Sequence, residues 1–103
     1  MDAVTRLKAS VLAADNNLRR ECEPIANLYN ALYQAVLRIM EGIESRKLSS
    51  MKLVNAAITG LYNSCYKEME SKFVSKKNRI KIDAALLQLA ENIRKYAKAY
   101  FPN

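Results

Sequence analysis

Hydrophobic residues recur three or four positions apart along nearly the whole chain, with polar residues between them, which is the period of an amphipathic α-helix. This spacing predicts helices over residues 4–18, 25–43, 51–73 and 82–100. Alternation typical of a strand is confined to residues 79–82, a run too short to support a sheet. We therefore expect an all-α fold.

Polar residues at the edges of these stretches predict where helices begin and end. Asp2 can cap the first helix, and Ser49 or Ser50 can cap the third. Gly60 lies inside the third helix, either as a mild weakener of the helix or as a point of close packing. Residues 75–79, Ser-Lys-Lys-Asn-Arg, carry no periodic apolar residue and are expected to connect the third helix to the fourth.

Pro24 lies between the first two predicted helices. The seven-residue apolar step of the first stretch continues past it into the second. The proline therefore either kinks one long helix or separates two helices, with Pro24 at the first position of the second. We favour the break, because Asn16, Asn17 and Glu21 weaken the turns that precede it.

Four amphipathic helices with short polar links are expected to close as an antiparallel four-helix bundle, because no helix can bury its apolar stripe alone. The chain has 103 residues, of which 50% are hydrophobic, with two glycines and two prolines. This length and composition predict a single helical domain over residues 1–103. If Pro24 only kinked the chain, three long helices would leave more apolar surface open, and dimerisation would be expected.

The residue types that carry most enzyme chemistry are absent or isolated. The chain has no histidine, the side chain best suited to proton transfer near neutral pH. Two glycines cannot form a phosphate-binding loop or a dinucleotide fingerprint. The carboxylate pairs Glu41/Glu44 and Glu68/Glu70 have no partner motif and are expected on a solvated face. We therefore expect no catalytic site, no cofactor and no metal ion.

Cys22 and Cys65 are separated by 42 residues, which is not the close pairing of a zinc site. Each lies on or beside an apolar stripe and is expected to be a small buried hydrophobe. The N-terminal residues lack the apolar segment of a signal peptide, so an intracellular, reducing compartment, the cytoplasm or the nucleus, is expected. A single disulfide between the two thiols stays open as an alternative. No uncharged stretch is long enough to span a bilayer.

Positive charge is concentrated in the last third of the chain. The net charge is +7, but residues 1–70 hold nine basic and eight acidic side chains, whereas residues 71–103 hold eight basic and two acidic ones. A local excess of this kind favours a polyanionic partner. The eight candidate binding residues are Lys72, Lys76, Lys77, Arg79, Lys81, Arg94, Lys95 and Lys98.

These eight side chains carry the leading functional hypothesis, a non-enzymatic nucleic-acid-binding bundle that forms a homodimer. It would contact the phosphate backbone of RNA or DNA with little sequence specificity, and Ser75 and Asn78 would add hydrogen bonds. Five of the eight fall within residues 72–81, where the third and fourth helices join, and three lie further along the fourth helix. The two groups form either one basic stripe or two separate patches.

Other interpretations compete with this hypothesis. The charged run between the third and fourth helices is also found in solubilising loops. The apolar step that persists past Pro24 favours a protein-interaction module, in which an apolar helix face docks a partner helix. Attachment to an anionic membrane through the same lysines ranks last. The tyrosines, paired at a spacing of four, are expected to pack in or beside the core rather than stack on bases: Tyr29, Tyr33, Tyr62, Tyr66, Tyr96 and Tyr100.

Overall fold

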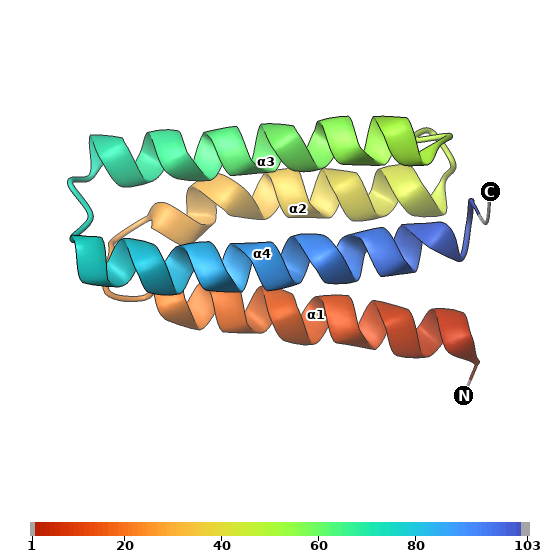
Figure 1. The fold of residues 1–103 in the computed structure, drawn as a ribbon, viewed down its shortest axis with the longest axis horizontal. Coiled ribbons are helices and arrows are strands. Elements are labelled where there is room, and N and C mark those ends of the chain that lie inside the picture. The colour runs from red at the N-terminus through yellow and green to blue at the C-terminus, as the bar shows by residue number, and fades with distance from the viewer. Residues whose placement is uncertain (1, 102–103) are drawn as a thin grey trace.

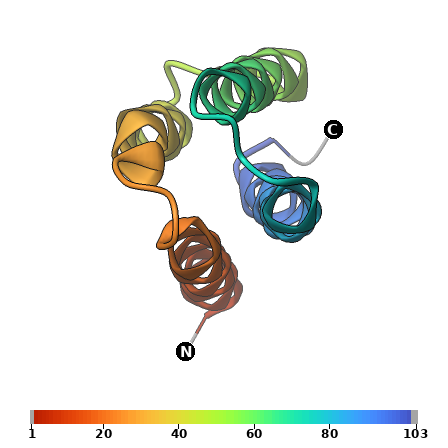
Figure 2. The ribbon, with the colours of Figure 1, turned by 90° about the vertical axis from the view of Figure 1, so that its left-hand side faces the viewer.

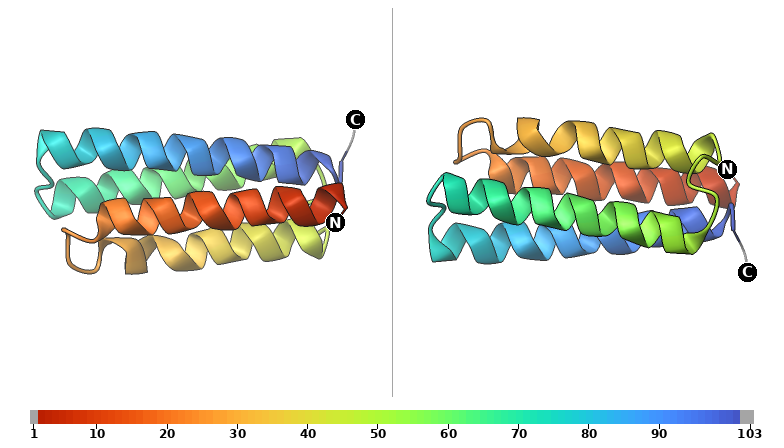
Figure 3. Two further views of the ribbon diagram at one scale, coloured as in Figure 1. Left: turned by 90° about the horizontal axis from the view of Figure 1, so that it is seen from below. Right: turned by 90° about the horizontal axis from the view of Figure 1, so that it is seen from above.

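The computed structural model describes residues 2–101, which form four α-helices and no strand. The helices are α1 (Ala3–Cys22), α2 (Leu28–Glu44), α3 (Met51–Ser71) and α4 (Lys76–Lys98). Successive helices run in opposite directions (Figure 1). Seen end-on, they follow one another around a ring, so that α4 returns beside α1 (Figure 2). The views from below and above agree (Figure 3). The predicted all-α antiparallel four-helix bundle is confirmed.

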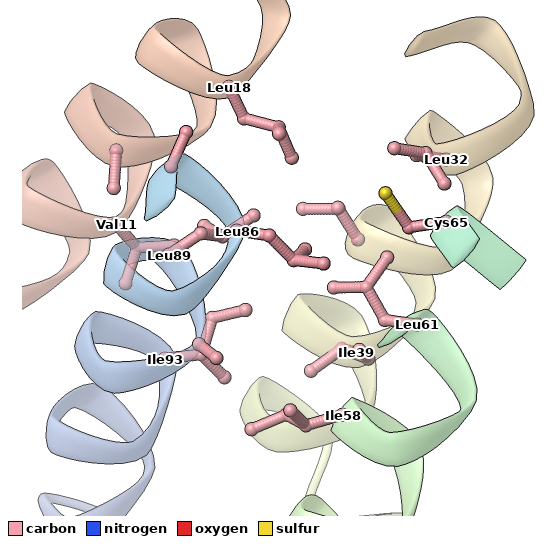
Figure 4. Packing of buried hydrophobic residues seen from close by; sticks show 14 of the residues in the cluster. Val11, Leu18, Leu32, Ile39, Ile58, Leu61, Cys65, Leu86, Leu89 and Ile93 are labelled. Atoms are coloured by element: carbon pink, nitrogen blue, oxygen red, sulfur yellow. The ribbon is translucent and has the colours of Figure 1, made fainter. Parts of the chain in front are cut away.

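The core is built from one apolar stripe on each helix, as the helical spacing predicted. Figure 4 shows Val11 of α1 and Leu86 and Leu89 of α4 facing Leu61 and Cys65 of the α2–α3 side. Within residues 2–101, every buried residue is of a hydrophobic type, and no buried polar side-chain atom lacks a hydrogen-bond partner. The fold therefore rests on side-chain packing between helices rather than on buried charge.

The break at Pro24 is confirmed, but its predicted position in the second helix was wrong. α1 ends at Cys22 and α2 begins at Leu28, so Pro24 lies in a link and not in the first turn of α2. Asn27 takes the left-handed conformation, with φ 66°, at the start of α2. Asn tolerates this conformation better than most residues, which lets the chain reverse within five residues. The three-helix alternative is thereby excluded.

The predicted connection over residues 75–79 was also wrong. Ser75 is the N-cap of α4, its hydroxyl accepts a hydrogen bond from the Asn78 N–H at 3.2 Å, and the charged run is the first turn of the helix. Apolar periodicity missed this turn because it extends past the core. Phe73, placed on the core stripe of the third helix by its spacing, is instead 92% exposed.

Two predicted helix caps are confirmed, and the structure decides between the two interpretations of Gly60. The Asp2 carboxylate accepts from the Thr5 N–H at 2.8 Å, and the Ser50 hydroxyl accepts from the Leu53 N–H at 3.3 Å. A Cβ built on Gly60 would meet nothing within 4 Å, so this glycine weakens α3 without allowing close packing. Among the described residues, no helix is long and apolar enough to cross a membrane.

Candidate nucleic-acid interface

The end of α3 explains why the chain turns sharply before the basic run. The Val74 N–H donates to the Met69 carbonyl at 3.0 Å, and the Phe73 N–H donates to the Glu70 carbonyl at 3.2 Å. These two bonds, with φ 52° at Phe73, form a Schellman motif, in which glycine is the usual left-handed residue. Val74 packs against the core beside buried Met69, so the motif turns Val74 inward and Phe73 outward.

We call the surface formed by residues 72–81 the tip. It lies at the left of Figure 1, where the α3–α4 link meets the link between α1 and α2. A shallow depression joins the two links, with Pro24 and Ile25 on one side and Lys72 and Asn78 on the other. The tip therefore forms one part of an end face of the bundle, and the α1–α2 link, which is distant in the sequence, forms the other part.

The first turn of α4 carries Lys76, Lys77 and Arg79 and no acidic residue. Cations at a helix N-terminus oppose the helix dipole, at a cost of order 0.3–1 kcal/mol each. Lys76, Lys77 and Arg79 are exposed and, among residues 2–101, have no ion-pair or hydrogen-bond partner for their side chains. The three cations therefore destabilise the start of α4, and no contact within residues 2–101 offsets this cost. Such a locally unfavourable arrangement is typical of a binding surface.

The tip cations point to different flanks of α4. Lys76 and Arg79 line a depression toward α3, together with Tyr66 and Asp83. Lys81 lines another depression toward α1, beside Glu21. Lys72 differs from the rest, because its Nζ lies 3.2 Å from Glu68 Oε2 one turn earlier. Four of the five predicted tip cations are therefore available to an external anion: Lys76, Lys77, Arg79 and Lys81.

The three cations near the end of α4, Arg94, Lys95 and Lys98, form a separate group, which we call the C-terminal cations. Lys77 and Lys95 share a face of α4, but they are five turns apart, about 27 Å at 1.5 Å per residue. The exposed side chain of Leu87 and the carboxylate of Glu91 lie along α4 between the two groups. The structure therefore gives two patches and not one basic stripe.

Two of the C-terminal cations are engaged within the fold. Arg94 Nε donates to Asn55 Oδ1 at 2.9 Å, which links α4 to α3. Lys95 Nζ lies 3.4 Å from Glu91 Oε1 on the same helix. Of this group, Lys98 alone has no such partner within residues 2–101. Within these described residues, Arg94 and Lys95 therefore have partners of a kind that Lys76, Lys77, Arg79 and Lys81 lack.

The end of the bundle opposite the tip holds a polar network that the sequence did not reveal. Lys8 Nζ lies 2.7 Å from Glu44 Oε2, and the Tyr96 hydroxyl donates to the same oxygen at 2.8 Å. The Lys8 ammonium, with the Tyr96 hydroxyl, holds the pKa of the Glu44 carboxyl below its ordinary value. Tyr96 and Tyr100 share a further hydrogen bond at 3.0 Å, and Arg46 donates to the Tyr100 carbonyl oxygen at 3.4 Å.

The tyrosine rings pair along their helices, with Tyr33 and Tyr66 exposed, and three of the tyrosine hydroxyls join residues of different helices. Each pair at a spacing of four is in ring contact, with centroids 6.2, 6.1 and 5.3 Å apart. Besides Tyr96, Tyr29 donates to Asp15 at 2.7 Å and Tyr66 donates to Asp83 at 2.7 Å. The bond to Asp83 is the main cause that raises the pKa of Tyr66 to about 12.

The two cysteines and Glu44 are groups that the sequence analysis considered for chemistry. Cys22 and Cys65 are buried and free, so the disulfide alternative is not realised within the described residues. Burial raises the pKa of Cys22 to about 12 and that of Cys65 to about 11, which keeps both thiols protonated near neutral pH. The Glu44 carboxylate, which the sequence paired with Glu41, forms an ion pair with Lys8. Among residues 2–101, no group of three or more metal-ligating side chains comes together.

Phe73 is the feature of this interface that the sequence analysis missed. Its spacing from Met69 continued the apolar stripe, but Met69 and Val74 are the pair that packs at the helix end. An apolar residue five positions after another, just before a capping serine, is the sequence signal of this motif.

No protein-family model, curated protein or solved structure matches this chain.

Proposed function

We propose that this protein is a non-enzymatic nucleic-acid-binding bundle that contacts phosphates through the tip. The observation that carries the proposal is a set of four cations that have no ion-pair or hydrogen-bond partner within residues 2–101. Three of them lie in the first turn of α4, where a positive charge weakens the helix. Bound phosphates would reverse that cost by neutralising the repulsion, and counterion release would supply most of the affinity. Contacts of this kind carry little sequence information.

The proposal is tested by two matched triple variants. Lys76→Gln, Lys77→Gln and Lys81→Gln together remove three charges from the tip, whereas Arg94→Gln, Lys95→Gln and Lys98→Gln remove three from the C-terminal cations. Affinity for a nucleic acid is measured from low to physiological salt. The tip variant is expected to lower the slope of log affinity against log salt by about 2–3, with little change in the control variant.

Two results would count against the proposal. The first is no binding of the unmodified protein to any nucleic acid at low salt. The second is an equal loss in both triple variants, because that would show attraction by total charge and not by the tip.

A second candidate function, docking of a partner helix or a second copy of the chain, is favoured by the seam between α1 and α2. The bonds Lys8–Glu44 and Tyr29–Asp15 mark the flanks on which these helices meet. Leu12, Tyr33 and Leu37 lie on the same flanks and are 51%, 46% and 37% exposed. Such a row of large apolar side chains is typical of a contact surface.

This candidate includes the homodimer expected from the sequence. Leu12→Glu with Leu37→Glu changes two exposed positions, so the helices should form as before. Sedimentation equilibrium of the unmodified protein should show a dimer, and that of the variant a monomer. A monomer in both proteins would remove the homodimer, and unchanged phosphate binding in the variant would separate the two functions.

A further inference from the structure

Phe73 is far more exposed than any other large apolar side chain of the described residues. It is 92% exposed, whereas the next, Ile80, is 62% exposed. It projects from the tip between Lys72 and the first turn of α4, which carries Lys76 and Lys77. An aromatic ring therefore stands free in the most cationic part of the end face.

Nothing in the fold accounts for a phenylalanine at this position. Three non-glycine residues within residues 2–101 have a left-handed backbone: Asn27, Arg46 and Phe73. Asn27 has a short polar side chain, which tolerates this conformation. Arg46 stacks on the Tyr100 ring with its guanidinium carbon 5.6 Å from the centroid. Phe73 has neither advantage, and a bulky residue in this region is a backbone outlier. The exposed ring is therefore better explained by a contact with a ligand than by a contact within the fold.

We propose that the Phe73 ring stacks on an unpaired base, so that the nucleic acid bound at the tip is single-stranded. This inference rests on the proposed function and specifies its ligand. Stacking on an aromatic side chain tolerates every base, in keeping with cations that read only phosphates. In a duplex the interior bases are already stacked on both faces, whereas a single strand, a loop or a frayed end offers a free face.

Charge on the rest of the end face favours a strand over an anionic membrane. The carboxylates of Glu21 and Glu23 lie near the α1–α2 link, and those of Glu68 and Glu70 near the end of α3. A flat membrane surface pressed against this end would meet these four carboxylates together with the cations. A narrow strand can follow residues 72–81 alone, where basic side chains predominate.

The first test compares a single strand with the duplex of the same sequence, for the unmodified protein, Phe73→Ala and Phe73→Gly. The unmodified protein should prefer the single strand, and both variants should lose about tenfold in affinity for it while binding the duplex as before. Phe73→Gly should also raise the melting temperature by about 4 °C, because glycine suits the left-handed position. Reduced binding by a more stable protein cannot be attributed to unfolding.

The outcomes separate the two proposals. Unchanged affinity of Phe73→Ala for the single strand would overturn stacking and leave phosphate binding at the tip intact. Absence of binding to both nucleic acids would overturn the proposed function itself.

The second test uses Phe73→Trp, since the chain has no tryptophan and the new indole reports on this site alone. Quenching on addition of a single strand is expected for stacking. A blue shift with vesicles containing acidic lipid, without quenching by the strand, would show insertion into a membrane and overturn the proposal. Leu53→Trp, near the start of α3 and away from the tip, is the matched control and should respond to neither ligand.

Discussion

The two ends of the bundle use aromatic and charged side chains in opposite ways. At the end opposite the tip, Tyr96 is 1% exposed and its hydroxyl meets Glu44, which in turn pairs with Lys8. At the tip, Phe73 is 92% exposed and Lys76 and Lys77 have no side-chain partner among the described residues. The same residue types therefore stabilise the fold at one end and are left available at the other.

This difference shows which charged side chains contribute to the stability of the fold. An aromatic ring or a charge with several contacts contributes to stability, and its replacement reports mainly on folding. A residue without contacts, in a conformation that costs free energy, is better explained by a contact outside the chain.

The largest contrast is expected between Tyr96→Ala and Phe73→Ala. Tyr96→Ala leaves a cavity in the core and should lower the free energy of unfolding by about 3–5 kcal/mol. Phe73→Ala removes a solvated ring and should change it by less than about 0.5 kcal/mol. Urea denaturation followed by circular dichroism measures both. A comparable loss in the two variants would contradict the exposed position of Phe73.

Alkaline pH should weaken the end opposite the tip through Tyr96. Burial, followed by the hydrogen bonds to Tyr100 and Glu44, raises the pKa of Tyr96 above its ordinary value of 10.0. Above pH 10 the unfolded chain therefore loses a phenol proton that the folded chain retains, and stability falls as the pH rises. Tyr96→Phe should show a shallower fall between pH 10 and 12 in thermal melts, whereas an unchanged slope would argue against the raised pKa.

Acidic pH should act on the same network through Glu44. Its folded pKa lies below the ordinary 4.5, so its contribution is present above about pH 4.5 and is lost as the pH falls through the folded value. Glu44→Gln should cost about 1 kcal/mol at pH 7, since the carboxylate is partly exposed. The variant and the unmodified protein should converge in stability as the pH falls below the folded pKa of Glu44. A constant difference across this range would show that the cost of Glu44→Gln comes from packing.

The smallest expected effects come from glycine at the two left-handed positions. Phe73→Gly should stabilise the protein by about 1 kcal/mol, because the strain disappears and no contact is lost. Arg46→Gly relieves similar strain but removes the contacts with Tyr100, so the net change should be within about 0.5 kcal/mol of zero. Differential scanning calorimetry measures the stability of both variants. Equal stabilisation by both glycines would mean that the Arg46 contacts contribute nothing.

The helices were predictable because hydrophobic residues recur every three or four positions over many residues, and this spacing sets which side chains face the core. Asp2 and Ser50 were also readable, since a capping side chain acts on the residues that follow it directly. The start of α4 was not found, because its first turn extends beyond the core and carries no apolar signal. Phe73 was misplaced because period alone extends α3, whereas the Schellman motif ends it and turns Val74 inward.

The placement of the candidate binding residues was predictable only in part. The basic run was visible in the sequence, but a linear count of charges could not show that Lys72 pairs with Glu68 and that Arg94 binds Asn55. Nor could it show that the two groups of cations lie at opposite ends of α4. These facts depend on how the antiparallel helices bring distant residues together.

The antiparallel arrangement places the start of α1 and the end of α4 together, at the end away from the tip (Figure 1). The molecule is 40 Å along its longest axis. An affinity tag or fused domain at either terminus therefore attaches on the far side from Phe73. Immobilised through such a tag, the protein would present the tip to solution, in an orientation suited to capturing a ligand on a surface.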